Sequence, residues 1–260
     1  MSKKKARIGF IGAGWWASSN HMPILSKRSD VELTAVCRLG EEKLYRVKEA
    51  FGFQYATQDY RSLLEDVELD GVVVASPHTL HYEHARAALE RGLNVMCEKP
   101  MCTKADDARE LVRLAQKYSL HLVVPYGWNY KYFVQEAKGR LDSGAVGKIE
   151  YLTSHMASPI RGLLEGGRFV GNASDENFFD PESETWADPR VAGGGYGHAQ
   201  LSHSLGMLFW LTGLEATHVY ALMSSPNSKV EIYNAISVHF NNGSIGTVSG
   251  AGNIPGQNRF

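Results

Sequence analysis

The feature that most constrains the fold is a glycine-containing turn close to the start of the chain. Residues 8–17 read IGFIGAGWWA, an apolar run followed by the pattern Gly-x-Gly-x-x-Ala. Gly12 permits a tight turn, Gly14 lets the backbone come close to a ligand, and Ala17 lets the next helix pack close to the strand. The N-terminus of that helix offers free N–H groups to a pyrophosphate. The pattern therefore predicts a phosphate-binding turn, with a tight turn that binds nothing as the alternative.

The pattern beyond this turn supports the prediction. Short β-branched runs alternate with helical segments, which is typical of a parallel sheet covered by helices. We expect strands at residues 7–11, 33–37, 71–75, 94–97 and 121–124, with a weaker one near 53–55. We expect helices at residues 42–51, 60–67, 80–92 and 105–118. The sequence thus predicts an α/β fold in which residues 1–125 form a Rossmann-type domain with a doubly wound parallel sheet.

Around residue 125 the pattern changes. A helix is expected at 129–142, and a polar stretch runs from 159 to about 192 before three consecutive glycines and a helix that ends near 211. Stretches this long without regular structure usually serve a function. We expect strands at residues 148–156, 217–223, 230–240 and 244–249, with a hairpin turn at Asn241-Asn242-Gly243. Residues 126–260 are therefore predicted to form an α+β domain with a mostly antiparallel sheet.

Charge and cysteine content exclude several classes of protein. Lys and Arg total 27 against 28 Asp and Glu, and this balance argues against nucleic acid and membrane surfaces as partners. No apolar run approaches the length of a membrane span, and no secretion signal follows the basic start. The three cysteines are too few and too scattered for a disulfide framework or a metal site, and they favour a reducing cytoplasm.

The end of the second expected strand indicates which dinucleotide binds. An acid there would hydrogen-bond the ribose 2′-hydroxyl of NAD, whereas an arginine accommodates the 2′-phosphate of NADP. The strand ends in Arg38, and Glu32 lies too early to take the acid's place. Arg38, helped by Lys43, therefore favours NADP. The alternative is that Arg38 is a solvated surface residue and that the site accepts either cofactor.

Three further segments follow the glycine turn in a characteristic order. They are residues 76–81 (SPHTLH), residues 98–100 (EKP), and residues 186–189 (WADP), which lead into Gly193-Gly194-Gly195 with His203 beyond. Together with the turn they resemble the Gfo/Idh/MocA family of nicotinamide-dependent oxidoreductases over nearly the whole chain. The resemblance implies hydride transfer between NAD(P) and a hydroxyl-bearing carbon of a sugar, a cyclitol or a derivative.

The resemblance also implies a role for Lys99, which would project from a strand end beside the nicotinamide ring. An ammonium there can stabilise negative charge that develops on the reacting oxygen, and partial desolvation would let it share in proton transfer. The Lys99–Pro100 peptide bond is expected to be cis. The cofactor is expected to contact Gly12, Gly14, Trp15, Trp16, Arg38, Ser76, His78, His81 and Glu98. For His78 and His81, a structural role at the start of the next helix is an equal alternative.

In the family, the helix after the three glycines usually carries an Asp and, four residues later, a His. These positions are Ala199 and His203 here. Because the Asp is missing, His203 is expected to act as the general acid/base with Lys99 as the electrophile. Gln200 would orient the substrate in place of the carboxylate, and Tyr196 lies on the same helical stripe. A buried His203 without a catalytic role is the alternative.

Residues 126–132 read YGWNYKY, where family members often carry an aromatic residue, Asn and two Arg. Aromatic faces suit the apolar side of a sugar ring, and an amide can reach its hydroxyls. Tyr126, Trp128 and Asn129 are therefore expected to contact the substrate. The alternative, held as equal, is that these aromatic residues only pack the junction between the domains.

Two other functions remain open for such a chain. One is a regulator that binds a dinucleotide and a sugar without turnover, which the loss of the Asp at Ala199 favours. The other is NAD-assisted glycoside cleavage, in which transient oxidation activates an elimination. The resemblance alone implies a homodimer or homotetramer. Family members usually continue beyond Phe260, so both a truncated product and a sheet with an unprotected edge are compatible with the sequence.

Overall fold

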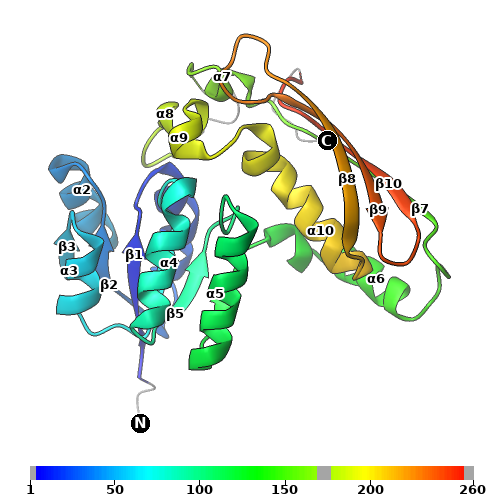
Figure 1. Cartoon of the computed structure of the whole chain (residues 1–260). Coiled ribbons are helices and arrows are strands. Elements are labelled where there is room, and N and C mark those ends of the chain that lie inside the picture. The colour runs from blue at the N-terminus through cyan, green and yellow to red at the C-terminus, as the bar shows by residue number, and fades with distance from the viewer. Residues whose placement is uncertain (1–3, 169–176, 255–260) are drawn as a thin grey trace. The chain divides into compact units, whose positions relative to one another are not determined.

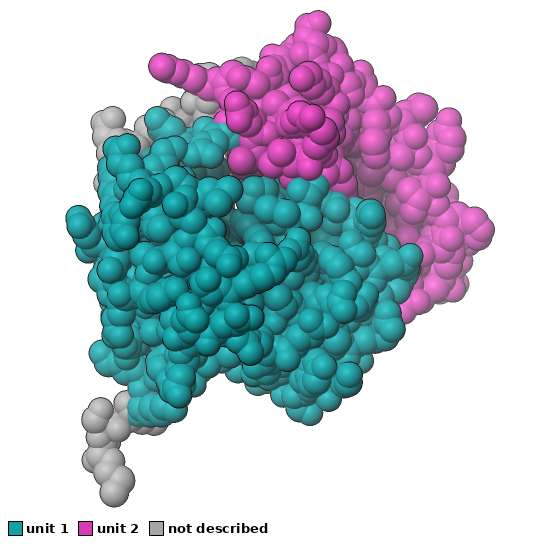
Figure 2. Space-filling model, turned by 60° about the vertical axis from the view of Figure 1, so that its left-hand side comes forward, with its two compact units in different colours: residues 1–125, 173–182 teal, residues 126–172, 183–260 magenta. Residues whose placement is uncertain are grey.

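The computed structural model describes residues 4–168 and 177–254, which form two compact units (Figures 1 and 2). Unit 1 contains the described residues up to Pro125 together with residues 177–182, and unit 2 contains the remainder. The sequence-based division placed residues 177–182 in the second domain. They belong to unit 1 because Phe178 and Phe179 pack against one of its apolar clusters.

Unit 1 is built on a six-stranded parallel sheet, with the order β3-β2-β1-β4-β5-β6. Its strands are β1 (Ala6–Ile11), β2 (Val31–Cys37), β3 (Tyr55–Thr57), β4 (Gly71–Val74), β5 (Asn94–Cys97) and β6 (Leu122–Val123). The strand order reverses between β1 and β4. Open α/β sheets bind ligands beyond the carboxyl ends of the strands at such a reversal. The doubly wound sheet expected from the sequence is confirmed.

Helices cover both faces of this sheet (Figure 1). They are η1 (Ala17–His21), α1 (Met22–Leu25), α2 (Glu41–Phe51), α3 (Tyr60–Asp66), η2 (His78–Leu80), α4 (His81–Glu90) and α5 (Ala105–Tyr118). Alternation along β1 separates the two apolar layers, since successive side chains of a strand point to opposite faces. Phe10 packs with residues of α1 and α2, whereas Ile11 packs with residues of α3, α4 and α5. Burial of both faces is what a parallel sheet requires.

Unit 2 contains a four-stranded sheet, with the order β7-β10-β9-β8. Its strands are β7 (Tyr151–Ala157), β8 (Ala216–Ser224), β9 (Tyr233–Phe240) and β10 (Ile245–Ala251). β9 pairs antiparallel with both neighbours, and only β7 and β10 run parallel, so the sheet is mostly antiparallel as expected. The predicted hairpin turn joins β9 to β10, with Gly243 at φ +86°.

The helical segments of unit 2 are η3 (Gly127–Tyr130), α6 (Tyr132–Asp142), α7 (Arg161–Leu164), α8 (Glu184–Ala187), α9 (Pro189–Ala192), η4 (Gly197–Leu201) and α10 (Ser202–Thr212). The long polar stretch of the sequence therefore contains three short helices, and residues 169–176 of it lie outside the described residues. Among the described helices, none is both long and apolar enough to cross a bilayer.

Candidate active site

Several predicted site residues lie just after strands of the parallel sheet. The glycine turn follows β1, Arg38 follows β2, Ser76 comes just after β4, and Glu98 and Lys99 follow β5. Because the carboxyl ends of parallel strands meet at one edge, unit 1 gathers these groups on the edge where such sheets bind ligands.

The two glycines of the turn differ in their surroundings. Gly12 has φ +94°, and a Cβ on it would lie 2.3 Å from the backbone N of Ser76 and 2.4 Å from the carbonyl carbon of Ala75. No heavy atom lies within 4 Å of a Cβ built on Gly14. Gly12 is therefore needed for the turn to pack against the end of β4. Gly14 leaves a bare backbone facing open space, which fits the close approach of a pyrophosphate.

The helix after this turn contains a π-helical turn, η1, which lets residues five apart share one side. Trp16 and His21, which are five residues apart, both contact the same carboxylate oxygen of Glu98. Trp16 Nε1 donates to Oε1 over 2.7 Å, and His21 Nε2 lies 2.6 Å from it. The second oxygen, Oε2, accepts a hydrogen bond from the backbone N–H of Lys99 over 2.9 Å.

These contacts hold Glu98 as a buried carboxylate. Burial raises its pKa, but the hydrogen bond and charge of His21 and the charge of Lys99 outweigh this effect, so the pKa of Glu98 lies below its usual range. The polar atoms of Trp16 and Glu98 are thus used inside unit 1, and their contact with the cofactor stays a prediction. His21 was missed by the sequence reasoning, because a spacing of five residues is not a helical signal.

Lys99 lies directly beyond this carboxylate. The residue is only 8% exposed, and its Nζ lies 5.9 Å from the centre of the Trp16 ring. The Lys99–Pro100 peptide bond is cis, as the resemblance implied. Glu98 and Trp16 therefore fix the backbone and the surroundings of the predicted electrophile.

His81 contacts Pro100, the residue that follows Lys99. Its Nδ1 lies 2.8 Å from the carbonyl oxygen of Pro100, and its Nε2 lies 2.8 Å from that of Ser76. Burial lowers the pKa of His81, although the contacts with these two carbonyl groups oppose the effect. Both ring nitrogens are engaged inside the protein, so His81 joins the end of β4 to Pro100 instead of contacting the cofactor as predicted.

The other predicted cofactor residues of unit 1 keep their predicted role as a hypothesis. Ser76 Oγ lies 2.9 Å from Nδ1 of His84. Trp15 packs edge-to-face on Trp16, and the His78 ring lies edge-on to His81.

Arg38 lies against the glycine turn. Its Nη1 donates to the carbonyl oxygen of Ala13 over 2.9 Å, and its Nε donates to that of Leu39 over 3.0 Å. Burial lowers the pKa of Arg38 and the charge of Glu182 opposes this, while the guanidinium stays charged as arginine does in proteins. The cation predicted to read the ribose substituent is thus attached to the phosphate-binding turn itself.

Unit 2 brings together three residues that the sequence analysis selected separately. The His203 ring on α10 is stacked on Trp128, with centroids 5.4 Å apart and planes at 27°. Tyr126 meets the same imidazole at a steep angle, with centroids 6.5 Å apart. A Cβ on Gly206 would lie 2.8 Å from the Tyr126 ring, so this glycine lets the ring approach α10. The predicted acid/base therefore lies between two predicted substrate-contacting aromatic residues.

Three amides of unit 2, those of Asn129, Gln200 and Asn234, have buried side-chain oxygen atoms without a hydrogen-bond partner among the described residues. Two of these atoms, Oδ1 of Asn129 and Oε1 of Gln200, belong to residues predicted to bind the substrate. Buried polar atoms are nearly always paired with protein, water or ligand. Both atoms therefore suit the predicted contact with substrate hydroxyls.

Tyr196 departs from its predicted role in substrate binding. Its side chain is completely buried in the apolar core of unit 2. Its hydroxyl donates to the carbonyl oxygen of Met156 over 3.0 Å and accepts from Ser158 over 2.9 Å. The π-helical turn η4 follows Tyr196, so the α-helical stripe assumed from the sequence does not extend back to it. Tyr196 is a packing residue.

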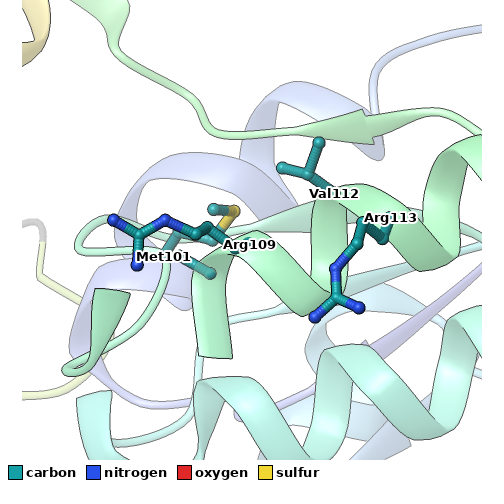
Figure 3. A pocket seen from close by; sticks show the side chains of 5 residues that line it. Met101, Arg109, Val112 and Arg113 are labelled. Carbon is teal, nitrogen blue, oxygen red and sulfur yellow. The ribbon is translucent and has the colours of Figure 1, made fainter. Parts of the chain in front are cut away.

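A surface pocket in unit 1 lies outside this set of residues. It is lined by Met101, Ala108, Arg109, Val112 and Arg113, mostly from α5 (Figure 3). None of them was selected from the sequence. Within residues 4–168 and 177–254, no group of three metal-ligating side chains occurs.

The strand order and the open glycine turn place unit 1 in the class of Rossmann dinucleotide-binding folds. Two family models match the chain. One, described as an oxidoreductase family with an NAD-binding Rossmann fold, matches residues 6–126, and the GFO/IDH/MocA C-terminal domain matches residues 134–260. The chain belongs to the Gfo/Idh/MocA family.

Individual relatives agree with this assignment. D-glucoside 3-dehydrogenase of Escherichia coli (strain K12) is 33% identical over 170 residues, which are 65% of this chain and 48% of the relative. Levoglucosan dehydrogenase of Pseudarthrobacter phenanthrenivorans is 24% identical over 97% of this chain and 69% of its own length. The chain spans about half the length of the first curated relatives it matches.

Solved structures show the same fold. A levoglucosan dehydrogenase in complex with NADH and levoglucosan superposes with a TM-score of 0.82 at 22% identity, covering 99% of this chain and 70% of that one. A myo-inositol 2-dehydrogenase from Lactobacillus plantarum gives a TM-score of 0.75 at 22% identity, over 95% and 70% of the two chains.

Proposed function

We propose that this protein is an oxidoreductase that transfers a hydride between a nicotinamide dinucleotide and a hydroxyl-bearing carbon of a sugar, a cyclitol or a derivative. The observation that carries the proposal is the buried Lys99, held beside Glu98 and Trp16 on the sheet edge that also carries the open glycine turn. Unit 1 would bind the dinucleotide, and unit 2 would bind the substrate.

Gly14 fits the dinucleotide, since it leaves a bare backbone and open space at the turn, while Gly12 allows the turn to pack against the end of β4. The nicotinamide supplies the hydride donor or acceptor. In the oxidative direction, His203 takes the proton of the substrate hydroxyl, and the Lys99 ammonium stabilises the negative charge on the oxygen while the C–H bond breaks. In the reductive direction, Lys99 polarises the carbonyl oxygen and His203 returns the proton.

Sugars and cyclitols are the proposed substrate class for two reasons. Tyr126 and Trp128 lie beside the proposed base. The side-chain oxygens of Asn129 and Gln200 are buried and accept no hydrogen bond from the described residues. Aromatic faces and buried amides together match a ring with an apolar side and hydroxyl groups. The names of the relatives, which include glucoside, levoglucosan and inositol dehydrogenases, support the same class.

A screen of the protein with NAD and NADP against glucosides, anhydrosugars and inositols tests the proposal through the absorbance of the reduced nicotinamide. We expect turnover with at least one of these substrate groups. Binding of a dinucleotide and a sugar without turnover would instead support the regulator that Ala199 favours.

Replacing His203 by glutamine is expected to lower kcat by about 10²–10³-fold, because general acid–base catalysis contributes on this scale. The change in KM should stay within a few-fold, since glutamine keeps a polar group beside Trp128. Steady-state kinetics on the substrate found in the screen measures both constants. His239→Gln on the exposed side of β9 is the matched control and should retain full activity. A His203 variant with unchanged kcat would show that the imidazole only packs.

A further inference from the structure

The segment formed by residues 177–182 is anchored on unit 1, although it lies far along the sequence from the rest of that unit. The Phe178 ring lies 5.3 Å from that of Phe51, and both Phe178 and Phe179 pack on the cluster that contains α1 and α2 residues. The guanidinium of Arg46 lies 4.8 Å from the centre of the Phe178 ring. These contacts fix the position of the residues that follow.

Glu182, the last residue of the segment, meets the two cations predicted to read the ribose 2′ position. Its Oε1 lies 2.7 Å from Nζ of Lys43 and 3.7 Å from Nη2 of Arg38. Phe179 adds a ring whose centre lies 4.8 Å from the Arg38 guanidinium. The Arg38 side chain is only 11% exposed, whereas those of Lys43 and Glu182 are about half exposed.

A carboxylate therefore lies beside the end of β2, although the residue that follows this strand is not an acid. In Rossmann domains that bind NAD, an acid after the second strand hydrogen-bonds the ribose hydroxyls. Here that position is Arg38, which is attached to the turn through the carbonyl of Ala13. Glu182 brings an acidic group to the same cation from a distant part of the chain.

We propose that Glu182 selects between the two cofactors and makes the protein prefer NAD. This inference rests on the proposed binding of a dinucleotide to unit 1. The carboxylate of Glu182 accepts a hydrogen bond from the ribose 2′-hydroxyl, and it neutralises part of the charge of Arg38 and Lys43. The preference is thus opposite to the one predicted from Arg38 alone.

Electrostatics gives the direction of the effect. A 2′-phosphate carries about −1.5 to −2 charges at neutral pH. It competes with Glu182 for Lys43 and Arg38, and two anions at such a site repel one another. The 2′-hydroxyl of NAD is neutral and meets no such penalty. Because Lys43 and Glu182 are about half exposed, solvent weakens the repulsion, so the effect is moderate.

Glu182→Gln tests the inference. We expect the Kd for NADP to fall about tenfold, which corresponds to 1.4 kcal/mol, while the Kd for NAD stays equal or rises a few-fold. Isothermal titration of the full chain with each dinucleotide gives both constants. Titration with 2′,5′-ADP and 5′-AMP tests the adenosine end without the nicotinamide, and only 2′,5′-ADP should gain affinity. Glu49→Gln, an exposed acid on the same helix as Lys43, is the control for net charge.

The interpretation also requires Arg38. In an Arg38→Gln background, Glu182→Gln should improve NADP binding much less, because the cation that the carboxylate neutralises is gone. An unchanged ratio of the NADP and NAD constants in Glu182→Gln, or an equal shift in Glu49→Gln, would overturn the inference. If the unaltered protein bound neither dinucleotide, the proposed function itself would fail. If it bound both with normal affinity and Glu182→Gln had no effect, only the role of Glu182 would be refuted.

Discussion

Replacing Lys99 by alanine is expected to lower kcat by about 10³-fold, because one preorganised charge at the reacting oxygen contributes on the order of 10²–10³ in rate and proton transfer adds to it. The affinity for the dinucleotide should change only a few-fold, since the glycine turn and Arg38 are untouched. Steady-state kinetics measures the first effect, and titration with the dinucleotide measures the second.

The surroundings of Lys99 make this variant interpretable. The backbone N–H of residue 99 still donates to Glu98, whose carboxylate keeps Trp16 and His21, so the local fold survives the loss of the ammonium. Lys104→Ala, at an exposed lysine before α5, is the matched control and should be fully active. Retention of activity on several sugars by the Lys99 variant would refute the proposed mechanism.

The fold was predictable because its signals are local and periodic. Two patterns predicted the parallel sheet and the edge that carries the candidate site. They are the turn between β1 and the next helix, and the alternation of apolar runs with helical segments. The mostly antiparallel second sheet followed from the hairpin signal at Asn241-Asn242-Gly243. In each case the signal is carried by residues that are neighbours in sequence, although the strands that then pair include distant ones.

The candidate site was predictable only in part, because several of its contacts join distant residues. Nothing in the sequence pairs His21 with Glu98, since the two residues are 77 positions apart and a π-helical turn places His21 on the same side as Trp16. Nothing brings Glu182 to Arg38, since the anchoring phenylalanines pack only in the folded chain. The sequence also does not distinguish a histidine that binds a ligand from one that, like His81, contacts two backbone carbonyl groups.

The prediction of NADP from Arg38 depends on such a contact. A cation after β2 predicts NADP as long as its neighbours in space are unknown. The structure adds an acid beside that cation, and the cofactor preference then depends on the sum of both charges.

Gly12→Ala and Gly14→Ala are expected to separate folding from dinucleotide binding. At Gly12 the residue has φ +94°, and the new Cβ would lie within 2.5 Å of three backbone atoms of Ala75 and Ser76. Backbone atoms cannot move aside as a side-chain end can, so the free energy of unfolding should fall by about 3 kcal/mol or more. Chemical denaturation of the protein without ligand measures this loss.

Gly14 provides the contrasting case, because its backbone has ordinary dihedral angles and a Cβ there meets no atom within 4 Å. The free energy of unfolding of Gly14→Ala should therefore stay within about 0.5 kcal/mol of the unaltered protein. The methyl group instead occupies the space that a pyrophosphate would need, so the Kd for NAD and NADP should rise by more than about tenfold. A Gly14 variant that binds both dinucleotides normally would remove the turn from the binding site. A stable Gly12 variant would show that the end of β4 can move away from the turn.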